Sequence, residues 1–271
     1  MNVRIGLAQH RIGPDMEENL RQAQRAVLAC AGQGAQLVLL PEMFCCLYQL
    51  ERLRACAQPR GGEIWKQLRA LACQAGVYLL GGSMPELDAQ GRIYNTSFFF
   101  SPAGEELACY RKCHLFDVSL PGGLCIQESS VFTPGEQLRV VESPFGKIGL
   151  AICFDLRFPE QFRALADRGA QLVLVPAAFN STTGPAHWEI NCRSRALDNQ
   201  VFLCACAPAA APDGPYPYYG HSMAIDPWGR ILTELTGEAC ERVVTLDLDE
   251  TARIRAQLPL LQSRRPELYR Q

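Results

Sequence analysis

Three side chains with complementary chemistry follow three strand-like segments of the chain. Glu42 ends the apolar run AQLVLLPE, Lys112 ends ELACYRK, and Cys153 ends KIGLAIC. A free thiol with a pKa of about 8.5 is mostly protonated at neutral pH, so a nucleophilic cysteine needs a base or a positive field nearby. Glu42 can supply the base, while Lys112 and the backbone N–H of Phe154 can stabilise an oxyanion. The set predicts nucleophilic catalysis by Cys153.

Each residue also has a structural interpretation when it is taken alone. Glu42 could cap a helix, Lys112 could be a solvated surface charge, and Cys153 could be a small buried hydrophobe. A histidine could also replace the glutamate as the base, because His114 lies two residues from Lys112. His187, in TTGPAHWE, either orients a loop or is a hydrogen-bonded core histidine. The conjunction of a carboxylate, a lysine and a thiol favours the catalytic interpretation.

The segments that carry these residues belong to an internal repeat. Each half reads as strand, helix, strand, helix, strand and hairpin, with helix periodicity in MEENLRQAQRAVLACAGQG and PEQFRALADRGA. The hairpins turn at Ser-Pro-Ala-Gly and Asp-Pro-Trp-Gly, which suit type I geometry. The matching segments are 5–9 with 148–152, 34–42 with 169–177, 77–86 with 201–210, and 97–110 with 222–235.

The repeat predicts an α/β fold in which two sheets stack face to face with helices outside. We expect this four-layer αββα sandwich to form a single domain over residues 1–271. A (β/α)₈ barrel of this length is the alternative, but paired hairpins are not barrel steps. In such sheets the reactive groups gather beyond the carboxyl ends of the strands. The second copy has Ala177 or Ala178 where the first has Glu42, so the strand itself does not require the carboxylate.

Composition limits the class of partner. The chain has 271 residues with a formal net charge of −2, which does not indicate a nucleic-acid or anionic-lipid surface. No run approaches the roughly 18 apolar residues of a membrane span, and no leader pattern opens the sequence. A cytoplasmic protein with a small-molecule ligand is therefore expected.

Thirteen cysteines, an odd number, are more consistent with reduced thiols than with a disulfide framework. A zinc site built from Cys109, Cys113, His114, Cys204 and Cys206 is the alternative, although no CxxC pair is present. We expect no metal.

The three segments around the candidate residues resemble the signature segments of the nitrilase, or carbon–nitrogen hydrolase, superfamily. They are PEMF at Glu42, YRKCHLFD at Lys112 and AICFDLRFPE at Cys153, and the resemblance covers essentially the whole chain. It implies the αββα sandwich and a homodimer, with Glu42 as general base, Lys112 as stabiliser of the tetrahedral intermediate and Cys153 as nucleophile. A further family glutamate falls on Glu128. The chemistry implied requires no metal or organic cofactor.

Within that superfamily, AFNSTTGPAHWE, RSRALDNQVF and the tail IRAQLPLLQSRRPELY most resemble the omega-amidases. These hydrolyse the terminal amide of short α-keto dicarboxylic monoamides, such as α-ketoglutaramate and α-ketosuccinamate. The resemblance implies substrate contacts from Arg157, Thr183 and Tyr48, although CCLYQ replaces the small-residue loop expected after PEMF. Arg157 lies about one helical turn after Cys153; an ion pair with Asp155 or Glu160 is its structural alternative. A deaminated glutathione amidase and a non-catalytic scaffold are the other functions considered.

Overall fold

Two open sheets form the centre of the molecule. The computed structural model describes residues 1–119, 125–214 and 216–269, and the following counts refer to these ranges. The first sheet has the order β15-β1-β2-β3-β5-β4, with β6 also paired to β5, and the second has the order β14-β13-β12-β11-β10-β9. The first sheet consists of β1 (Asn2–Gln9), β2 (Leu37–Leu39), β3 (Tyr78–Leu80), β4 (Met84–Leu87), β5 (Ile93–Phe100), β6 (Glu106–Arg111) and β15 (Cys240–Asp247). The second consists of β9 (Arg139–Ser143), β10 (Gly146–Leu150), β11 (Leu172–Pro176), β12 (Phe202–Cys206), β13 (Met223–Ile225) and β14 (Ile231–Glu234). A separate hairpin pairs β7 (Asp117–Ser119) with β8 (Cys125–Gln127).

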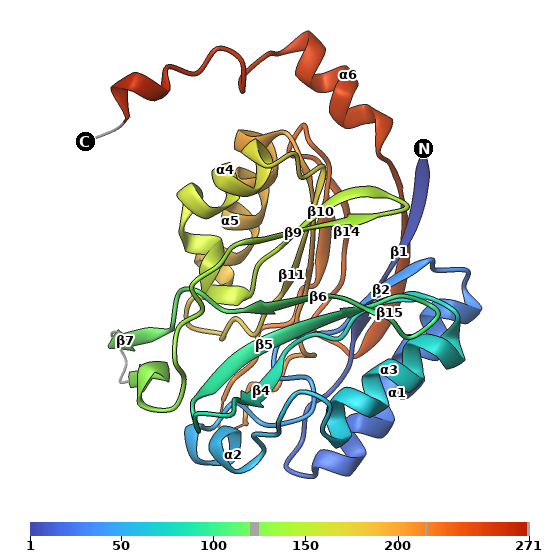
Figure 1. The fold of residues 1–271 in the computed structure, drawn as a ribbon, viewed down its shortest axis with the longest axis vertical. Helices are drawn as coiled ribbons and strands as arrows, with labels where there is room; N and C mark the ends of the chain where they lie inside the picture. The colour runs from blue at the N-terminus through green and yellow to red at the C-terminus, as the bar shows by residue number, and fades with distance from the viewer. Residues whose placement is uncertain (120–124, 215, 270–271) are drawn as a thin grey trace.

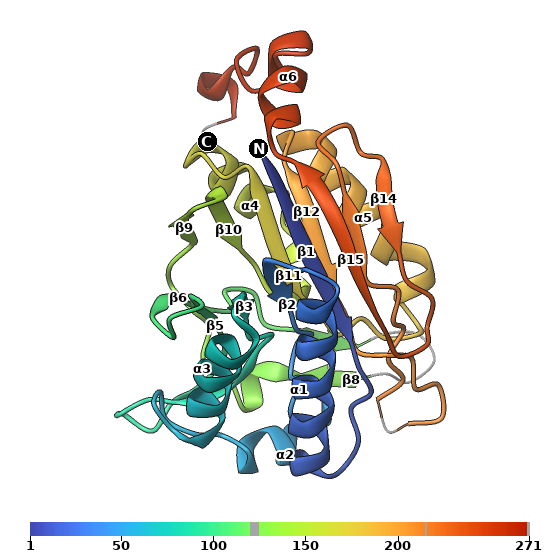
Figure 2. The same ribbon diagram turned by 90° about the vertical axis from the view of Figure 1, so that its right-hand side faces the viewer.

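Helices cover the outer face of each sheet. Figure 1 shows α1 (Met16–Gly32) and α3 (Glu63–Ala75) on one side of the sheets, and α4 (Pro159–Asp167) and α5 (Gly184–Asn199) on the other. Figure 2 shows α1 and α3 side by side in front of the first sheet. Two further helices among the described residues are α2 (Leu50–Ala55) and α6 (Asp249–Gln257). Within the described ranges, no helix combines the length and apolarity needed to cross a membrane.

Alternating side chains of the strands fill two separate cores. In β2, Leu37 and Leu39 join a core that also contains Ile148 of the second sheet, whereas Val38 packs in a different core with Val27 of α1. This alternation follows from the period of two in an extended strand, because neighbouring side chains point to opposite faces. Both faces of the strand are therefore buried. The predicted αββα sandwich is confirmed, and the barrel alternative is wrong.

The internal repeat appears as two equivalent sets of parallel strands. In the first half β1, β2 and β3 pair in parallel, and in the second half β10, β11 and β12 do the same. The hairpins β5–β6 and β13–β14 follow in matching positions. Their turns close as predicted, with Gly104 N–H donating to Ser101 O and Gly229 N–H donating to Asp226 O, both at 2.9 Å. Helix α1 ends at Gly32, two residues before the predicted limit.

The carboxyl ends of the repeated strands meet across the sandwich. The backbone N–H of Glu42, beyond β2, donates to the carbonyl of Ala177, beyond β11, over 3.4 Å. These two residues occupy matching positions in the repeat, so the pairing brings the two copies into direct contact. One side of this contact carries a carboxylate and the other a methyl group. At this contact the first copy of the repeat therefore carries the ionisable group and the second does not.

Candidate active site

Cys153 lies at a sharp change of backbone direction. It follows β10 and begins a short 3₁₀ helix, Cys153–Arg157, and its φ angle is 44°. Left-handed backbone is uncommon for residues other than glycine, and such strain is typical of functional sites. Asp155 holds the turn, because its Oδ2 accepts a hydrogen bond of 2.9 Å from Ile152 N–H. Cys153 as a residue is 8% exposed, so the turn presents its thiol to a nearly closed space.

A buried ion pair joins the other two predicted residues. Lys112 Nζ lies 2.9 Å from Glu42 Oε1, and both side chains are completely buried. The same carboxylate oxygen accepts a 2.8 Å hydrogen bond from Asn95 Nδ2. The backbone supports this arrangement, since Lys112 N–H donates to Asn95 O over 2.9 Å. The adjacent strands β5 and β6 therefore orient the lysine and the amide toward one oxygen of Glu42.

Glu128 closes the charge cluster from the β7–β8 hairpin side. Both of its oxygens accept from Lys112 Nζ, at 3.0 and 2.9 Å. The carboxylate also accepts short hydrogen bonds from the Tyr48 hydroxyl and from the Phe116 N–H. Tyr48 lies behind this cluster, with its ring 4.7 Å from that of Tyr216. Its hydroxyl is already engaged by Glu128, so its contact with substrate stays a prediction.

Burial sets the protonation of the thiol and the carboxylate. Burial, and then the charge of Glu42, hold the pKa of Cys153 well above its usual 9.0, although Lys112 opposes the shift. Burial also raises the pKa of Glu42 above 4.5, against the attraction of Lys112. For Lys112, burial alone would lower the pKa, but Glu128 and Glu42 outweigh it and raise the pKa. The resting site therefore holds a neutral thiol beside a carboxylate of increased basicity, with a lysine that stays charged.

A narrow pocket opens over the sulfur. Its walls combine aromatic rings with a few polar groups, which is typical of a site for a small ligand. Besides Cys153 the lining consists of Phe116, Phe154, Arg157, Ala178, Phe179, Asn180, Thr183 and Tyr216. Four predicted residues, namely Cys153, Phe154, Arg157 and Thr183, thus share one pocket.

Arg157 lies on the pocket wall without a carboxylate partner. Within the described residues no acidic oxygen lies in ion-pair range of its guanidinium, so the alternative of a pair with Asp155 or Glu160 is wrong. Its Nη1 instead donates to His187 Nδ1 over 3.1 Å. The guanidinium carbon also lies 5.2 Å from the centre of the Phe179 ring. A cation that contacts only an imidazole nitrogen and an aromatic face remains free to bind an anion.

Sequence reasoning did not identify three further residues of the site, namely Asn95, Asn180 and Tyr216. Asn180 Oδ1 accepts from the N–H groups of Thr182 and Thr183, at 3.0 and 2.9 Å, at the start of α5. Its Nδ2 is buried and has no hydrogen-bond partner among the described residues. Tyr216 donates to Ala178 O over 2.7 Å beside the pocket. Asn180 lies within AFNSTTG, a segment that the family resemblance had already singled out. Asn95 and Tyr216 lie in no such segment, and only the packing of the folded chain brings them to the site.

The fold and this geometry agree with the comparisons to known proteins. A family model described as carbon-nitrogen hydrolase matches residues 4–256. Omega-amidase NIT2 of Xenopus tropicalis, of Mus musculus and of Homo sapiens are each 41% identical to this chain over 266 residues, which is 98% of the chain and 96% of each relative. The chain belongs to the carbon–nitrogen hydrolase family, within the nitrilase superfamily. It is therefore an amide-hydrolysing enzyme.

Solved structures of other carbon–nitrogen hydrolases superpose over nearly the whole chain. Saccharomyces cerevisiae Nit3, a member of branch 10 of the nitrilase superfamily, has a TM-score of 0.89 at 34% identity and covers 97% of both chains. A mutant of the amidase from Nesterenkonia sp. AN1 has a TM-score of 0.83 at 32% identity and covers 98% of both chains. The structure of that amidase shows the result of Michael addition of acrylamide at its active site cysteine.

The histidines of this hydrolase have other partners. His114 Nδ1 lies 2.7 Å from Asp155 Oδ1, and its ring stacks on Phe158 at 3.7 Å. Asp155, not Cys153, therefore holds this imidazole. His187 is exposed on α5, so its interpretation as a core histidine is wrong. The surface interpretation of Lys112 is wrong as well, because its side chain is fully buried.

The zinc site considered as an alternative from the sequence requires cysteines that the fold does not bring together. Among the described residues, no three histidine, cysteine, aspartate or glutamate side chains gather in a way that could hold a metal ion. Cys204 and Cys206 are buried within β12, whereas Cys109 and Cys113 are partly exposed.

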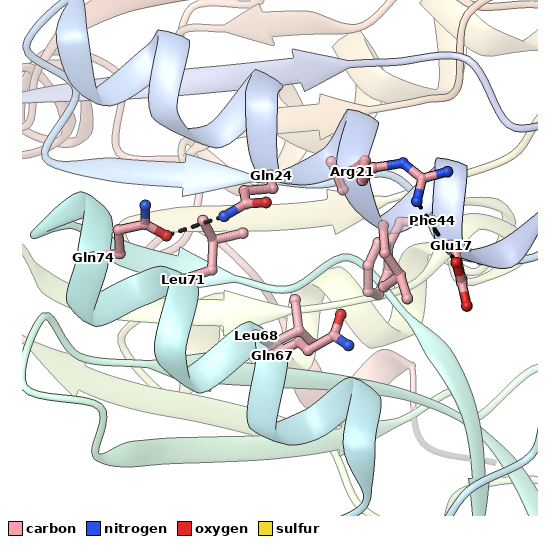
Figure 3. Close-up of a pocket in the computed structure, with 10 residues that line it drawn as sticks. Glu17, Arg21, Gln24, Phe44, Gln67, Leu68, Leu71 and Gln74 are labelled. Atoms are coloured by element: carbon pink, nitrogen blue, oxygen red, sulfur yellow. Dashed lines mark hydrogen bonds and ion pairs between the residues drawn. The ribbon is translucent and has the colours of Figure 1, made fainter.

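A second, wider groove of the hydrolase lies between α1 and α3. Figure 3 shows its walls, where Gln24 and Gln74 bridge the helices at 3.1 Å and Arg21 faces Glu17 at 3.6 Å. None of the ten residues that line it is a candidate catalytic or substrate-binding residue. The catalytic assignment therefore concerns the Cys153 pocket alone.

Proposed function

We propose that this enzyme is an omega-amidase that hydrolyses the terminal amide of short α-keto dicarboxylic monoamides. The observation that carries the proposal is the guanidinium of Arg157, which has no acidic partner within the described residues and lies on the wall of the Cys153 pocket. A substrate with an amide at one end and a carboxylate at the other can bring its amide to the thiol and its carboxylate to the guanidinium within this one pocket. The similarity to omega-amidase NIT2 from several vertebrates supports the same substrate class.

The first half of the reaction forms a thioester. The Cys153 sulfur attacks the amide carbon while Glu42 takes the thiol proton, and the carbonyl oxygen becomes an oxyanion. Glu42 Oε2 is suited to this step, because it is buried and has no hydrogen-bond partner among the described residues. Lys112 and the N–H of Phe154 stabilise the oxyanion; the first N–H groups of a helix have no acceptor within that helix. The first tetrahedral intermediate collapses as Glu42 returns its proton to the nitrogen, so the C–N bond breaks, ammonia departs and the thioester is formed.

The second half of the reaction releases the acid. The Glu42 carboxylate then takes a proton from water, whose oxygen attacks the thioester carbon. Collapse of the second tetrahedral intermediate frees the α-keto acid and the thiol. Glu128 touches no reacting atom in this scheme; it anchors Lys112 through two hydrogen bonds.

Substrate orientation follows from the polar groups at the pocket wall. Arg157 holds the distal carboxylate, for which a planar guanidinium offers two parallel donors. The free Nδ2 of Asn180 donates to the α-keto or carboxylate oxygens, and Thr183, whose hydroxyl donates to Asn180 Oδ1 over 3.3 Å, contacts the substrate from the same wall. Aromatic rings of Phe116, Phe154 and Phe179 exclude water from the reacting carbon.

Initial rates of product formation on α-ketoglutaramate and on deaminated glutathione test the proposal. We expect the larger kcat/KM on α-ketoglutaramate, because a short dicarboxylic monoamide matches the narrow pocket. A preference for deaminated glutathione would replace omega-amidase with the sister activity. Trapping the acyl adduct on Cys153 and weighing it by mass spectrometry reports the acid portion directly.

We further propose that the enzyme acts in the cytoplasm as a homodimer. Thirteen unpaired cysteines among the described residues support a reducing compartment. Light scattering coupled to size exclusion, together with fractionation of cells, tests both points.

A further inference from the structure

Two thiols outside the catalytic pocket lie in direct contact. The sulfur atoms of Cys46 and Cys56 are 3.0 Å apart and share a hydrogen bond. A disulfide bond is about 2.05 Å long, so the two sulfurs need to approach by only about 1 Å to become bonded. The two residues are ten positions apart in sequence. This contact is therefore a feature of the folded loop and not of neighbouring residues.

The two cysteines differ in exposure and in acidity. Cys46 is 4% exposed, whereas Cys56 is partly open to solvent. A hydrogen bond from Cys46 lowers the pKa of Cys56 to about 7 against the effect of burial, and the charge of Arg52 adds to the lowering. The same hydrogen bond, together with burial, raises the pKa of Cys46. The pair thus combines an accessible thiolate with a buried thiol, an arrangement that suits attack on an oxidant followed by internal resolution.

We propose that Cys46 and Cys56 form a redox site that a hydroperoxide converts into an intramolecular disulfide. With hydrogen peroxide, the Cys56 thiolate attacks one peroxide oxygen, the O–O bond breaks, and the departing hydroxide is protonated to water, which leaves a sulfenic acid on Cys56. The Cys46 thiol then attacks that sulfur, and the hydroxyl departs as a second water. Two thiols are oxidised and one peroxide is reduced to two waters. An external dithiol reverses the reaction by exchange.

The disulfide would enclose a segment that supports the catalytic cluster. Residues 46–56 contain Tyr48, whose backbone N–H donates to the Tyr218 hydroxyl over 2.9 Å and whose own hydroxyl donates to Glu128. The segment also contains α2, at the lower edge of the molecule in Figure 1. Cross-linking its two ends removes conformations in which the segment opens. Oxidation therefore fixes the position of Tyr48 behind Glu128 and Lys112.

Tryptic mapping tests the bond directly. Trypsin cleaves between the two cysteines, after Arg52 and Arg54, so Cys46 falls in peptide 26–52 and Cys56 in peptide 55–60. The folded enzyme is treated with hydrogen peroxide, its remaining thiols are alkylated, and it is digested without reductant. We expect a species that joins the two peptides and separates on reduction, in the unchanged enzyme and in Cys73→Ser, a variant of an exposed helix thiol. Cys46→Ser and Cys56→Ser must both lose it.

Peptide 26–52 contains three thiols, those of Cys30, Cys45 and Cys46, and Cys45→Ala distinguishes the two adjacent ones. The joined species persists in this variant if Cys46 is the partner. Its loss there, its survival in Cys46→Ser, or conversion of Cys56 only to sulfinic acid would overturn the proposal.

Hydrogen exchange tests the effect on the segment. We expect amides of residues 47–55 to exchange at least about tenfold more slowly in the oxidised enzyme, and Cys56→Ser to show no response to peroxide. Equal exchange before and after oxidation of the unchanged enzyme would show that the bond does not fix the segment. Neither peptide mapping nor hydrogen exchange depends on amide hydrolysis. The redox site is therefore tested independently of the proposed substrate.

Discussion

Lys112 and Glu42 are joined through only one oxygen of the carboxylate. Lys112 Nζ donates to Glu42 Oε1 at 2.9 Å, and Asn95 Nδ2 donates to the same atom at 2.8 Å. Oε2 is buried and has no hydrogen-bond partner among the described residues. A buried carboxylate oxygen without a partner is unfavourable, and such groups in native proteins often have a catalytic role. The lysine and the asparagine thus orient the base and leave its second oxygen free for the Cys153 proton.

Glu42→Gln removes the base while keeping the shape of the side chain. We expect kcat for amide hydrolysis to fall by about a thousandfold or more, because general base catalysis typically contributes 10²–10⁴-fold. The amide oxygen of glutamine can still accept from Lys112, so circular dichroism and the melting temperature serve as the control for folding. A variant that keeps more than about a tenth of the original rate would show that another group takes the proton.

The rate should depend on pH through the raised pKa of Glu42. Burial raises the pKa of this carboxyl above 4.5, so the basic form is lost as the pH falls through that higher value. The Cys153 thiol, whose pKa burial raises above 9.0, stays protonated across the neutral range and does not set this limb. We therefore expect kcat/KM to rise with pH on the acidic side, with a midpoint above 4.5. A midpoint at or below the ordinary glutamate value would contradict the assignment, and Glu42→Gln should have no such limb.

The sequence was sufficient to predict where the main reactive groups gather. Glu42, Lys112 and Cys153 each follow a strand, and the repeat determined how those strands pair, so their convergence followed from topology. Pattern alone did not reveal Asn95, which lies inside β5 and reaches Glu42 only because β5 neighbours β6 and Lys112. Tyr216 likewise lies far along the chain from any reactive residue.

The surroundings of charged side chains were the least predictable feature. Arg157 was assigned a possible acidic partner on its own helix, yet Asp155 turns inward to bind Tyr110 at 2.6 Å and His114. His187 was interpreted as either a residue that orients a loop or a hydrogen-bonded core histidine, but it is exposed on α5. Local sequence does not determine which way such side chains point, because packing of distant segments decides the available partners.

Lys112→Met should destabilise the enzyme as well as inactivate it. The substitution leaves the Glu42 and Glu128 carboxylates buried without their shared cation, and breaking a buried ion pair typically costs about 3–5 kcal/mol. Urea unfolding measures the loss. A second substitution, Glu128→Gln, removes one of the two facing charges, so the double variant should recover part of the stability while its hydrolysis stays absent. An unchanged unfolding free energy in Lys112→Met would mean that the cluster is not held by charge.

Tyr48→Phe distinguishes support of the charge cluster from binding of substrate. The hydroxyl donates to Glu128 and the residue does not line the Cys153 pocket among the described residues. Removing it should lower kcat by about a few-fold and reduce stability by roughly 1.5–3 kcal/mol, the range for a hydrogen bond to a charged group. KM for α-ketoglutaramate should remain close to its original value. A rise in KM at constant kcat would instead place the hydroxyl on the substrate.

Arg157→Met tests whether the free guanidinium selects a dicarboxylic monoamide. Arg157 lies on the pocket wall and donates to His187. Its loss should lower kcat/KM for α-ketoglutaramate by about a hundredfold, since an unpaired charge in a binding site costs several kcal/mol. A neutral short amide such as propionamide lacks the distal carboxylate, so its kcat/KM should change by less than about threefold. His187→Ala is the matched control, because it removes the neighbour but keeps the cation, and its effect on both substrates should be small. An equal fall on the charged and the neutral amide would assign Arg157 to the structure of the pocket and not to recognition of the carboxylate.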